Sequence, residues 1–166
     1  MKIAKIETDY IQIPLARPFK TALRTVESVH DLVVRITADT GQVGYGEAPP
    51  TAVITGDTLG SIRCAIEEFI APSLMGMDVE DLDGIMAKLH SCILKNTSAK
   101  AAVDMAVYDL YAKQLGRPLY KVLGGRRNSL ETHLTISVNP VEEMVGESLA
   151  AVAGGYRILK VKVGKE

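Results

Sequence analysis

Two lysines stand two positions apart near the C-terminal end of the 166-residue sequence, in the run Lys160-Val161-Lys162. In an extended strand, side chains two positions apart share a face, so both ammonium groups would point the same way. Two like charges held side by side repel each other, which favours the neutral amine of one of them. A neutral lysine can take a proton near neutral pH, so the pattern predicts a general base.

A second interpretation of the same run needs no chemistry. Lysines are common on the exposed edge strands of sheets, where their charge keeps the strand from pairing with another molecule. The residues around Lys160 and Lys162 leave both interpretations open.

An arginine marks a second candidate position. Arg24 lies in the segment 18–25, beside apolar residues that include Phe19 and Leu23. A guanidinium in such surroundings is suited to binding a carboxylate through two parallel hydrogen bonds. An ordinary ion pair within the loop is the alternative, and the sequence does not separate the two.

The lysine pair closes a unit made of two strands and a helix. Residues 132–138 and 158–163 are rich in β-branched residues and predict strands, and the segment between them predicts a helix. Asn139 as a capping residue and Pro140 as the first helical residue are typical of a helix start, and Gly154 is typical of its end. Strands joined by one helix are parallel neighbours, so we expect a βαβ unit.

The first fifty residues predict an antiparallel sheet of three strands. The strands are expected at residues 3–15, 32–38 and 43–47, and the second alternates apolar and polar residues with a period of two. The intervening segments 18–25 and 48–56 are longer than a hairpin requires. Loops of that kind often carry function.

Three helices are predicted after the sheet. The first is expected to be capped by Asp57 and stopped by Pro72, and the second carries an apolar stripe over residues 82–93. The third is expected to be capped by Ser98 and to cover residues 99–115. Small side chains on one face of this helix would let another element approach closely. They are Ala99, Ala102 and Ala106.

Composition and charge exclude several classes of protein. The sequence has 19 Lys+Arg against 20 Asp+Glu, and a net charge of −1 gives no reason to expect a nucleic-acid or anionic-membrane partner. No apolar stretch approaches the roughly 18 residues of a membrane span, and the charged N-terminus has no hydrophobic signal region. Cys64 and Cys92 predict two buried, reduced thiols rather than a disulfide, and therefore a cytoplasmic protein. No Cys/His cluster has the spacing of a zinc site.

Together these segments resemble the N-terminal capping domain and first barrel strands of the enolase superfamily, in its muconate-lactonizing-enzyme branch. Residues 99–125 closely match the signature helix of that branch and the Gly-Gly that follows it. The run Lys160-Val161-Lys162 matches the K-x-K motif at the end of the second barrel strand. Within the branch, segments 18–25 and 46–57 are similar to the two substrate-covering loops of the dipeptide epimerases, such as the L-Ala-D/L-Glu epimerases.

The resemblance implies a fold class and a domain organisation. Residues 1–125 are expected to form an α+β capping domain, in which a three-stranded antiparallel meander is followed by a helical bundle. Residues 126–166 are expected to be the first βαβ unit of an incomplete (β/α) barrel. A closed barrel of this kind takes about 250 residues. The chain is therefore expected to be the N-terminal part of a longer enzyme.

The resemblance also implies an activity, the epimerisation of dipeptides such as L-Ala-L-Glu by removal and return of the α-proton. Lys162 would be one of two opposed acid/base lysines, and Lys160 would contact the substrate carboxylate. Arg24 would bind the side-chain carboxylate of an acidic dipeptide residue, and Thr135 would line the substrate pocket. The expected enzyme is a homo-oligomer whose only substrate partner is a small dipeptide.

The cofactor that the resemblance implies is Mg²⁺, which would stabilise an enediolate intermediate. Its carboxylate ligands are expected on later barrel strands outside this chain, so no metal ligand is expected here and the chain alone is expected to be inactive. Two alternatives stay open. One is another enzyme of the branch, such as an o-succinylbenzoate synthase, an N-acylamino acid racemase or a cycloisomerase, and the other is a non-catalytic folded fragment.

Overall fold

The computed structural model describes residues 1–164 of the chain. These residues form two compact units. The first comprises Met1–Gln12 and His30–Arg126, and the second comprises Ile13–Val29 and the chain from Arg127 onward. The first two strands run through both units. The domain limits expected at residues 1–125 and 126–166 stay a prediction.

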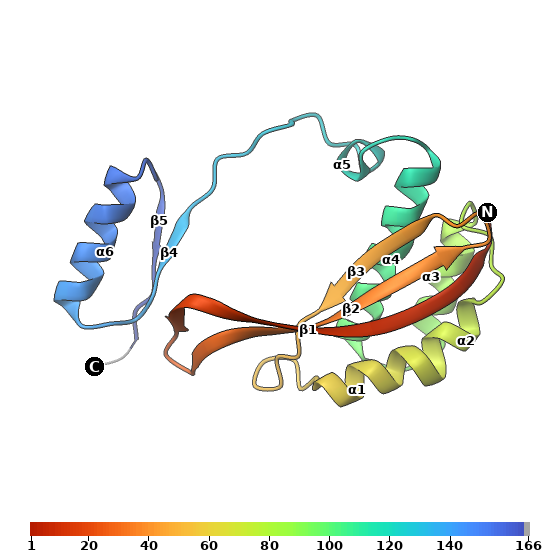
Figure 1. The fold of residues 1–166 in the computed structure, drawn as a ribbon, viewed down its shortest axis with the longest axis horizontal. Coiled ribbons are helices and arrows are strands. Elements are labelled where there is room, and N and C mark those ends of the chain that lie inside the picture. The colour runs from red at the N-terminus through yellow and green to blue at the C-terminus, as the bar shows by residue number, and fades with distance from the viewer. Residues whose placement is uncertain (165–166) are drawn as a thin grey trace. The chain divides into compact units, whose positions relative to one another are not determined.

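The sheet is an antiparallel meander, which confirms the predicted topology (Figure 1). Its three strands pair in chain order and are β1 (Ile3–Lys20), β2 (Thr25–Ala38) and β3 (Val43–Ala48). Along β2 the apolar residues alternate, and Leu32, Val34 and Ile36 are buried in the core of the first unit. The period of two in this segment therefore gave the correct buried face.

The first two strands are longer than the sequence predicts. β1 continues to Lys20 and β2 begins at Thr25, so the segment expected to be a long loop is the tip of a hairpin. The backbone N–H of Thr21 donates to the carbonyl of Arg24 at 2.9 Å and closes that tip. β1 contains Pro14 and Pro18, and it is an edge strand, where proline is tolerated.

The helix α4 (Thr97–Gln114) lies directly against β3 and forms the main helix–sheet contact of the first unit. A Cβ atom added at Gly46 would lie 1.9 Å from the carbonyl oxygen of Ala102, and one at Gly44 would lie 2.1 Å from that of Ala106. Two glycines and the alanines of the helix therefore bring the two backbones together. The predicted close approach to this helix is confirmed, and β3 is the element that makes it.

The same helix also satisfies backbone groups of β3. The carboxylate of Asp109 accepts a hydrogen bond from the Tyr45 N–H at 2.9 Å, and the ammonium of Lys113 donates to the Val43 carbonyl at 2.8 Å. Asp109 and Lys113 are themselves an ion pair, with 2.7 Å between Oδ2 and Nζ. The pair thus joins helix and strand through groups that the β2–β3 ladder leaves free.

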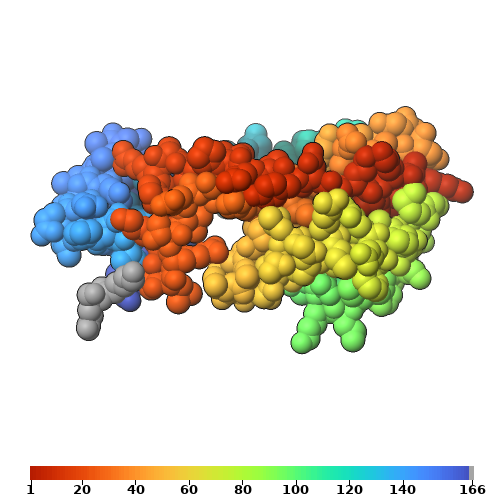
Figure 2. All heavy atoms as spheres, turned by 60° about the horizontal axis from the view of Figure 1, so that its bottom comes forward, coloured from red at the N-terminus to blue at the C-terminus, as the bar shows by residue number. Residues whose placement is uncertain are grey.

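A continuous helical run covers residues 59–74 and lies along the N-terminal part of β1 (Figure 2). It consists of α1 (Leu59–Cys64), the π-helical segment η1 (Ala65–Ile70) and α2 (Ala71–Leu74). Pro72 was expected to stop this helix but lies inside it. Proline has no N–H to donate within a helix, and here the hydrogen-bond ladder is already widened just before it, since the Ala71 N–H donates to the Ile66 carbonyl.

Two predicted helix caps in the first unit are wrong. The side chain that caps α1 belongs to Thr58, which accepts a hydrogen bond from the Ser61 N–H, and α4 begins after Asn96 without a side-chain cap. Asp57 and Ser98, the predicted caps, are instead hydrogen-bonded to each other, with the Ser98 hydroxyl donating to Asp57 Oδ2 at 2.5 Å. Their side-chain oxygens are occupied by a contact between distant segments.

The remaining helices of this unit are α3 (Leu82–Ser91) and the short α5 (Leu119–Val122). Ile85 and Leu89 of α3 are fully buried, which confirms the predicted apolar stripe. The carboxylate of Asp81 caps α3 by accepting from the Gly84 N–H.

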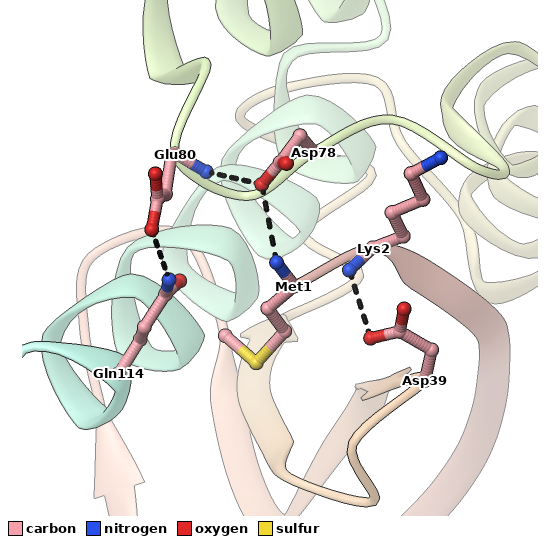
Figure 3. A network of polar contacts seen from close by, with 6 residues as sticks. All are labelled: Met1, Lys2, Asp39, Asp78, Glu80 and Gln114. Carbon is pink, nitrogen blue, oxygen red and sulfur yellow. Dashed lines mark hydrogen bonds and ion pairs between the residues drawn. The ribbon is translucent and has the colours of Figure 1, made fainter.

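The N-terminus is anchored to the loop that precedes α3 (Figure 3). The Met1 amine lies 3.4 Å from Asp78 Oδ1, which also accepts a hydrogen bond from the Glu80 N–H at 3.1 Å. The Lys2 N–H donates to Asp39 Oδ1 at 2.9 Å. These contacts hold the start of β1 between two turns of the first unit.

The C-terminal part of the second unit is the predicted βαβ arrangement. It contains β4 (Leu134–Ile136), α6 (Val141–Ala153) and β5 (Leu159–Val161), and β4 and β5 are parallel. Asn139 was predicted to cap α6, but the helix follows Pro140 without a side-chain cap. The Asn139 amide oxygen instead accepts a hydrogen bond from the Lys20 ammonium at 2.9 Å.

Both cysteines of the chain are free, but they are not two buried thiols. Cys64 is exposed and Cys92 is half-buried. Cys64 lies on the outer side of α1, where partial desolvation and the neighbouring Glu68 carboxylate raise the pKa of its thiol. Within residues 1–164, no helix is long and apolar enough to cross a membrane.

Candidate active site

The candidate site lies at the carboxyl ends of β4 and β5. In the parallel register, Thr135 pairs with Lys160 and Ile136 with Val161. The backbone N–H of Lys162 donates to the Ile136 carbonyl at 3.0 Å, which continues the ladder beyond β5. Side chains paired across parallel strands point to the same face, so Thr135, Lys160 and Lys162 share one face of this two-stranded sheet.

The two lysines differ in their surroundings. Lys160 is exposed, whereas Lys162 is half-buried. Lys162 also borders a groove of about 460 Å³ between α6 and the end of β5, together with Val161 and Val163. The apolar side chains that line this groove from α6 are Val141, Met144, Val145 and Leu149. The period of two places the two lysines on one face of the sheet, and Lys162, which follows the end of β5, also borders the groove beside α6.

The tip of the β1–β2 hairpin is hydrogen-bonded to the end of β4. The Lys20 N–H donates to Ser137 Oγ at 3.3 Å, and the Lys20 carbonyl accepts from the Val138 N–H at 3.3 Å. The Lys20 ammonium donates to Asn139 Oδ1 at 2.9 Å. These three hydrogen bonds bring the predicted loop residues into the same unit as the lysine pair.

Arg24 follows Lys20 by four residues on this tip and is exposed. The Thr21 hydroxyl accepts hydrogen bonds from the backbone N–H groups of Leu23 and Arg24, both at 3.2 Å. The backbone around Arg24 is thus organised by one threonine. Among the residues that the structure describes, no carboxylate forms an ion pair with the Arg24 guanidinium, so its donors are free to bind a ligand.

Thr135 borders a second hollow of about 440 Å³ in this unit. The hollow lies between β4, α6 and the hairpin, and residues that include Phe19, Ser137 and Tyr156 also line it. All four sequence-predicted site residues, Arg24, Thr135, Lys160 and Lys162, therefore belong to the second unit. Their roles stay a prediction.

The other predicted covering loop belongs to the first unit, where it forms a compact turn. The N–H groups of Ile54 and Thr55 both donate to the Thr51 carbonyl at 2.9 Å, and Gly56 adopts a φ of 81°. Val53 and Ile54 are about two-thirds exposed, at 67% and 70%. These exposed apolar side chains fit a segment that meets a ligand or another part of a longer protein.

Sequence reasoning missed the residues that tie the hairpin to β4. Lys20 lies in the segment 18–25, which was predicted to be a functional loop, but nothing in its local sequence indicated a partner more than a hundred residues away. Asn139 was interpreted as a helix cap, which is the usual role of asparagine before a proline at a helix start. Ser137 carried no signal at all.

The described residues do not provide a metal site. No group of three or more His, Cys, Asp or Glu side chains in residues 1–164 is placed to hold a metal ion. The donor set that Mg²⁺ requires, several carboxylate or other oxygen ligands, is therefore not assembled by this part of the chain.

Fold and site together define an α+β domain joined to the beginning of a parallel β/α sheet, with candidate residues at the carboxyl ends of its strands. Residues 5–124 match the family described as the mandelate racemase / muconate lactonizing enzyme N-terminal domain. The chain belongs to this family.

Known relatives match beyond that domain. The L-Ala-D/L-Glu epimerase of Clostridium acetobutylicum is 55% identical over 165 residues, which are 99% of this chain and 46% of that protein. A substrate-liganded complex of the L-Ala-D/L-Glu epimerase from Bacillus subtilis superposes with a TM-score of 0.97 at 49% identity, covering 100% of this chain and 46% of that one. The dipeptide epimerase from Methylococcus capsulatus, complexed with Mg and the dipeptide L-Arg-D-Lys, superposes with a TM-score of 0.88 at 38% identity, covering 98% of this chain and 46% of that one. This chain thus spans about half the length of the relatives it matches.

Proposed function

We propose that the protein containing this chain epimerises dipeptides such as L-Ala-L-Glu. The observation that carries the proposal is the shared face of Thr135, Lys160 and Lys162 at the carboxyl ends of two parallel strands, with the hairpin that carries Arg24 bonded to the same strand end. Enzymes built on β/α barrels hold their chemistry at this end of the strands. The full-length similarity of this chain to the first part of dipeptide epimerases supports the same reaction.

In the proposed reaction Lys162 is an acid/base group. Its amine takes the α-proton of the substrate from one face, or its ammonium returns a proton there when the reaction runs from the other epimer. The half-buried position of Lys162 supports this role, because it limits the water that competes for the proton.

Lys160 is proposed to contact the substrate carboxylate. Removing a proton next to a carboxylate places further negative charge on its oxygens, and a neighbouring ammonium stabilises that charge. Thr135, paired with Lys160 in the register of β4 and β5, is proposed to line the substrate pocket beside it.

The charge on those oxygens is proposed to be offset further by Mg²⁺, as Mg complexes of relatives suggest. The residues described here do not form its ligand set, so the ligands are proposed to lie outside this chain. The steps assigned to Lys160 and Lys162 are proton transfer and charge stabilisation by their own side chains.

Arg24 is proposed to select an acidic side chain in the substrate. A guanidinium binds a carboxylate through two parallel hydrogen bonds, worth roughly 1.5–3 kcal/mol for a charged partner. In the full-length protein, Arg24→Ala should therefore lower kcat/KM for L-Ala-L-Glu by roughly 10- to 150-fold. Steady-state kinetics with L-Ala-L-Glu and with L-Ala-L-Met separate this effect from general damage, because the methionine dipeptide has no side-chain carboxylate and should lose far less.

The matched control is Arg117→Ala, which removes an exposed arginine of the first unit. This variant should leave kcat/KM unchanged for both dipeptides. Equal losses on both dipeptides in Arg24→Ala would show that Arg24 shapes the hairpin rather than the specificity.

The same assay distinguishes the alternative enzymes of the branch. Turnover of N-acylated amino acids or of muconate, without epimerisation of any dipeptide, would replace the proposed activity with a racemase or cycloisomerase. We also propose a cytoplasmic location, for which the two free cysteines are the support.

A further inference from the structure

Lys20, at the tip of the β1–β2 hairpin, is hydrogen-bonded through both its backbone and its side chain to a distant segment of the chain. Its N–H, its carbonyl and its ammonium are all hydrogen-bonded, and their partners are the three residues that follow β4, namely Ser137, Val138 and Asn139. The side chain is half-buried. A single residue of the hairpin thus contacts three consecutive residues at the strand end.

The backbone contact of Lys20 ends the β4–β5 ladder. The Leu134 N–H donates to the Ile158 carbonyl, and the Lys162 N–H to the Ile136 carbonyl. Continued in the same parallel register, the Val138 N–H would donate to the carbonyl of Lys162. It donates instead to the carbonyl of Lys20 at 3.3 Å. The Val138 N–H is therefore bonded to the hairpin, and the β4–β5 ladder is not continued at this residue.

The side-chain contact of Lys20 fixes geometry rather than neutralising charge. Its acceptor, Asn139 Oδ1, belongs to an uncharged amide, and no ion pair of Lys20 occurs among residues 1–164. Asn139 lies between β4 and α6. The ammonium therefore connects the hairpin to the segment that joins the strand and the helix of the βαβ unit.

The connection continues from Lys20 to Arg24 through Thr21. The Thr21 N–H donates to the Arg24 carbonyl, and the Thr21 hydroxyl accepts from the Arg24 N–H. A turn closed in this way leaves the backbone little freedom between the two basic residues. The position of the Arg24 backbone is therefore set by where Lys20 is bound.

We propose that Lys20 is a positioning residue, which holds the hairpin tip at the carboxyl end of β4 and so places Arg24 to bind the acidic side chain of the substrate. This inference rests on the proposed dipeptide epimerase function. It assigns the preference for an acidic dipeptide to two residues: Arg24 binds the carboxylate, and Lys20 holds Arg24 in place.

The test uses the full-length protein and the variant Lys20→Met, which keeps a long side chain and removes the ammonium. A contact that is equally strong in the ground state and the transition state affects KM and not kcat. Lys20→Met should therefore raise KM for L-Ala-L-Glu about 10-fold, as expected for loss of a hydrogen bond to a charged group, with little change in kcat. The KM for L-Ala-L-Met should hardly change.

Three further variants make the result specific. Asn139→Ala removes the acceptor and should reproduce the KM effect, whereas Lys20→Arg keeps a donor and should restore most of the affinity. In an Arg24→Ala background, Lys20→Met should change KM by less than about 2-fold, because the two residues act on the same contact. Lys88→Met, at an exposed lysine of α3, is the matched control and should have no effect.

Hydrogen exchange of the same variants tests the tether, meaning the hydrogen bonds of Lys20 to residues 137–139, without relying on enzymatic activity. Lys20→Met should increase exchange in peptides that contain residues 20–24 and 138, while the buried core of the first unit stays protected. If the wild-type protein epimerises no dipeptide, the proposed function fails, and the exchange result still decides the tether. Equal losses on both dipeptides, full additivity with Arg24→Ala, or unchanged exchange at the hairpin would overturn the inference.

Discussion

At the scale of single residues, the two lysines of the pair differ in their surroundings, and their roles stay a prediction. An edge-strand lysine has its side chain in water, and this describes Lys160. Lys162 is half-buried, is still part of the hydrogen-bonded ladder and borders an apolar groove. Of the two, Lys162 thus has the surroundings that suit proton transfer.

Lys162→Ala in the full-length protein should abolish proton exchange on one face of the substrate only. If Lys162 serves one face and an opposed group the other, exchange of the α-proton with heavy water should fall about 10²- to 10⁴-fold for one epimer and persist for the other. Proton NMR of each epimer in D₂O measures this directly. Equal exchange rates of both epimers in the variant would rule out the assignment.

Asp31 is a buried charged residue of the first unit. The sequence pattern did not predict that its side chain would be buried. It is 6% exposed, and its carboxylate accepts a hydrogen bond from the Leu32 N–H at 2.9 Å. Burial, and after it the neighbouring Glu47 carboxylate, raise the pKa of Asp31 above its ordinary value of 3.8. The folded state therefore binds a proton at Asp31 more tightly than the unfolded state does.

Because the pKa of Asp31 is higher in the folded state, the free energy of unfolding falls as the pH rises from the unfolded-state pKa to the folded-state pKa of this residue. Asp31→Asn keeps an amide oxygen for the Leu32 N–H and removes the buried charge, so it should raise Tm at pH 7. The gain should shrink toward zero below the ordinary pKa of 3.8. Thermal unfolding across pH checks this, and Glu47→Gln should give a smaller gain at neutral pH. A lower Tm for Asp31→Asn at pH 7 would contradict the prediction.

At the scale of elements, β3 and α4 form the main helix–sheet contact of the first unit. The glycines of β3 face the helix backbone without room for a side chain, which makes this contact sensitive to a single methyl group.

Gly46→Ala should destabilise the fold, because its Cβ would lie 1.9 Å from the Ala102 carbonyl oxygen, which is backbone and cannot rotate away. Overpacking of this kind costs about 1–3 kcal/mol or more. Gly60→Ala is the matched control, since its Cβ would meet nothing closer than 4.0 Å and lies in a helix. It should be neutral or stabilising by about 1 kcal/mol. Chemical denaturation of both variants compares the two, and equal effects would refute the packing argument.

The elements also show what the sequence could and could not predict. Periodicity located the strands and the buried stripe of α3, and small residues at helical spacing indicated the close approach of α4, because these signals are local. The caps Asp57, Ser98 and Asn139 were wrong for one shared reason. Each has the right residue type for a cap, but its side chain binds a partner far away in the sequence. The tether of the hairpin through Lys20 was missed for the same reason.

At the scale of the whole molecule, residues 1–166 produced alone should neither epimerise dipeptides nor bind Mg²⁺ at an active site. The described residues contain no group of metal ligands, and only one lysine is proposed for acid/base work. Val161 and Val163 are also exposed, at 49% and 79%, beside the apolar groove of α6, which should promote association. Calorimetry with Mg²⁺ and a dipeptide assay on material of verified mass test this. Metal-dependent turnover by that material would contradict it.

The ion pair of Asp109 and Lys113 has a consequence for how copies of the protein can assemble. A strand at the edge of a sheet offers unpaired N–H and carbonyl groups to which a strand of another molecule can add. On β3, the Tyr45 N–H and the Val43 carbonyl are already bonded to that pair. Growth of the sheet from one subunit into the next is therefore blocked at this edge. Any assembly of copies of this chain should therefore join through other surfaces, and loss of the pair should favour irregular aggregates over ordered assembly.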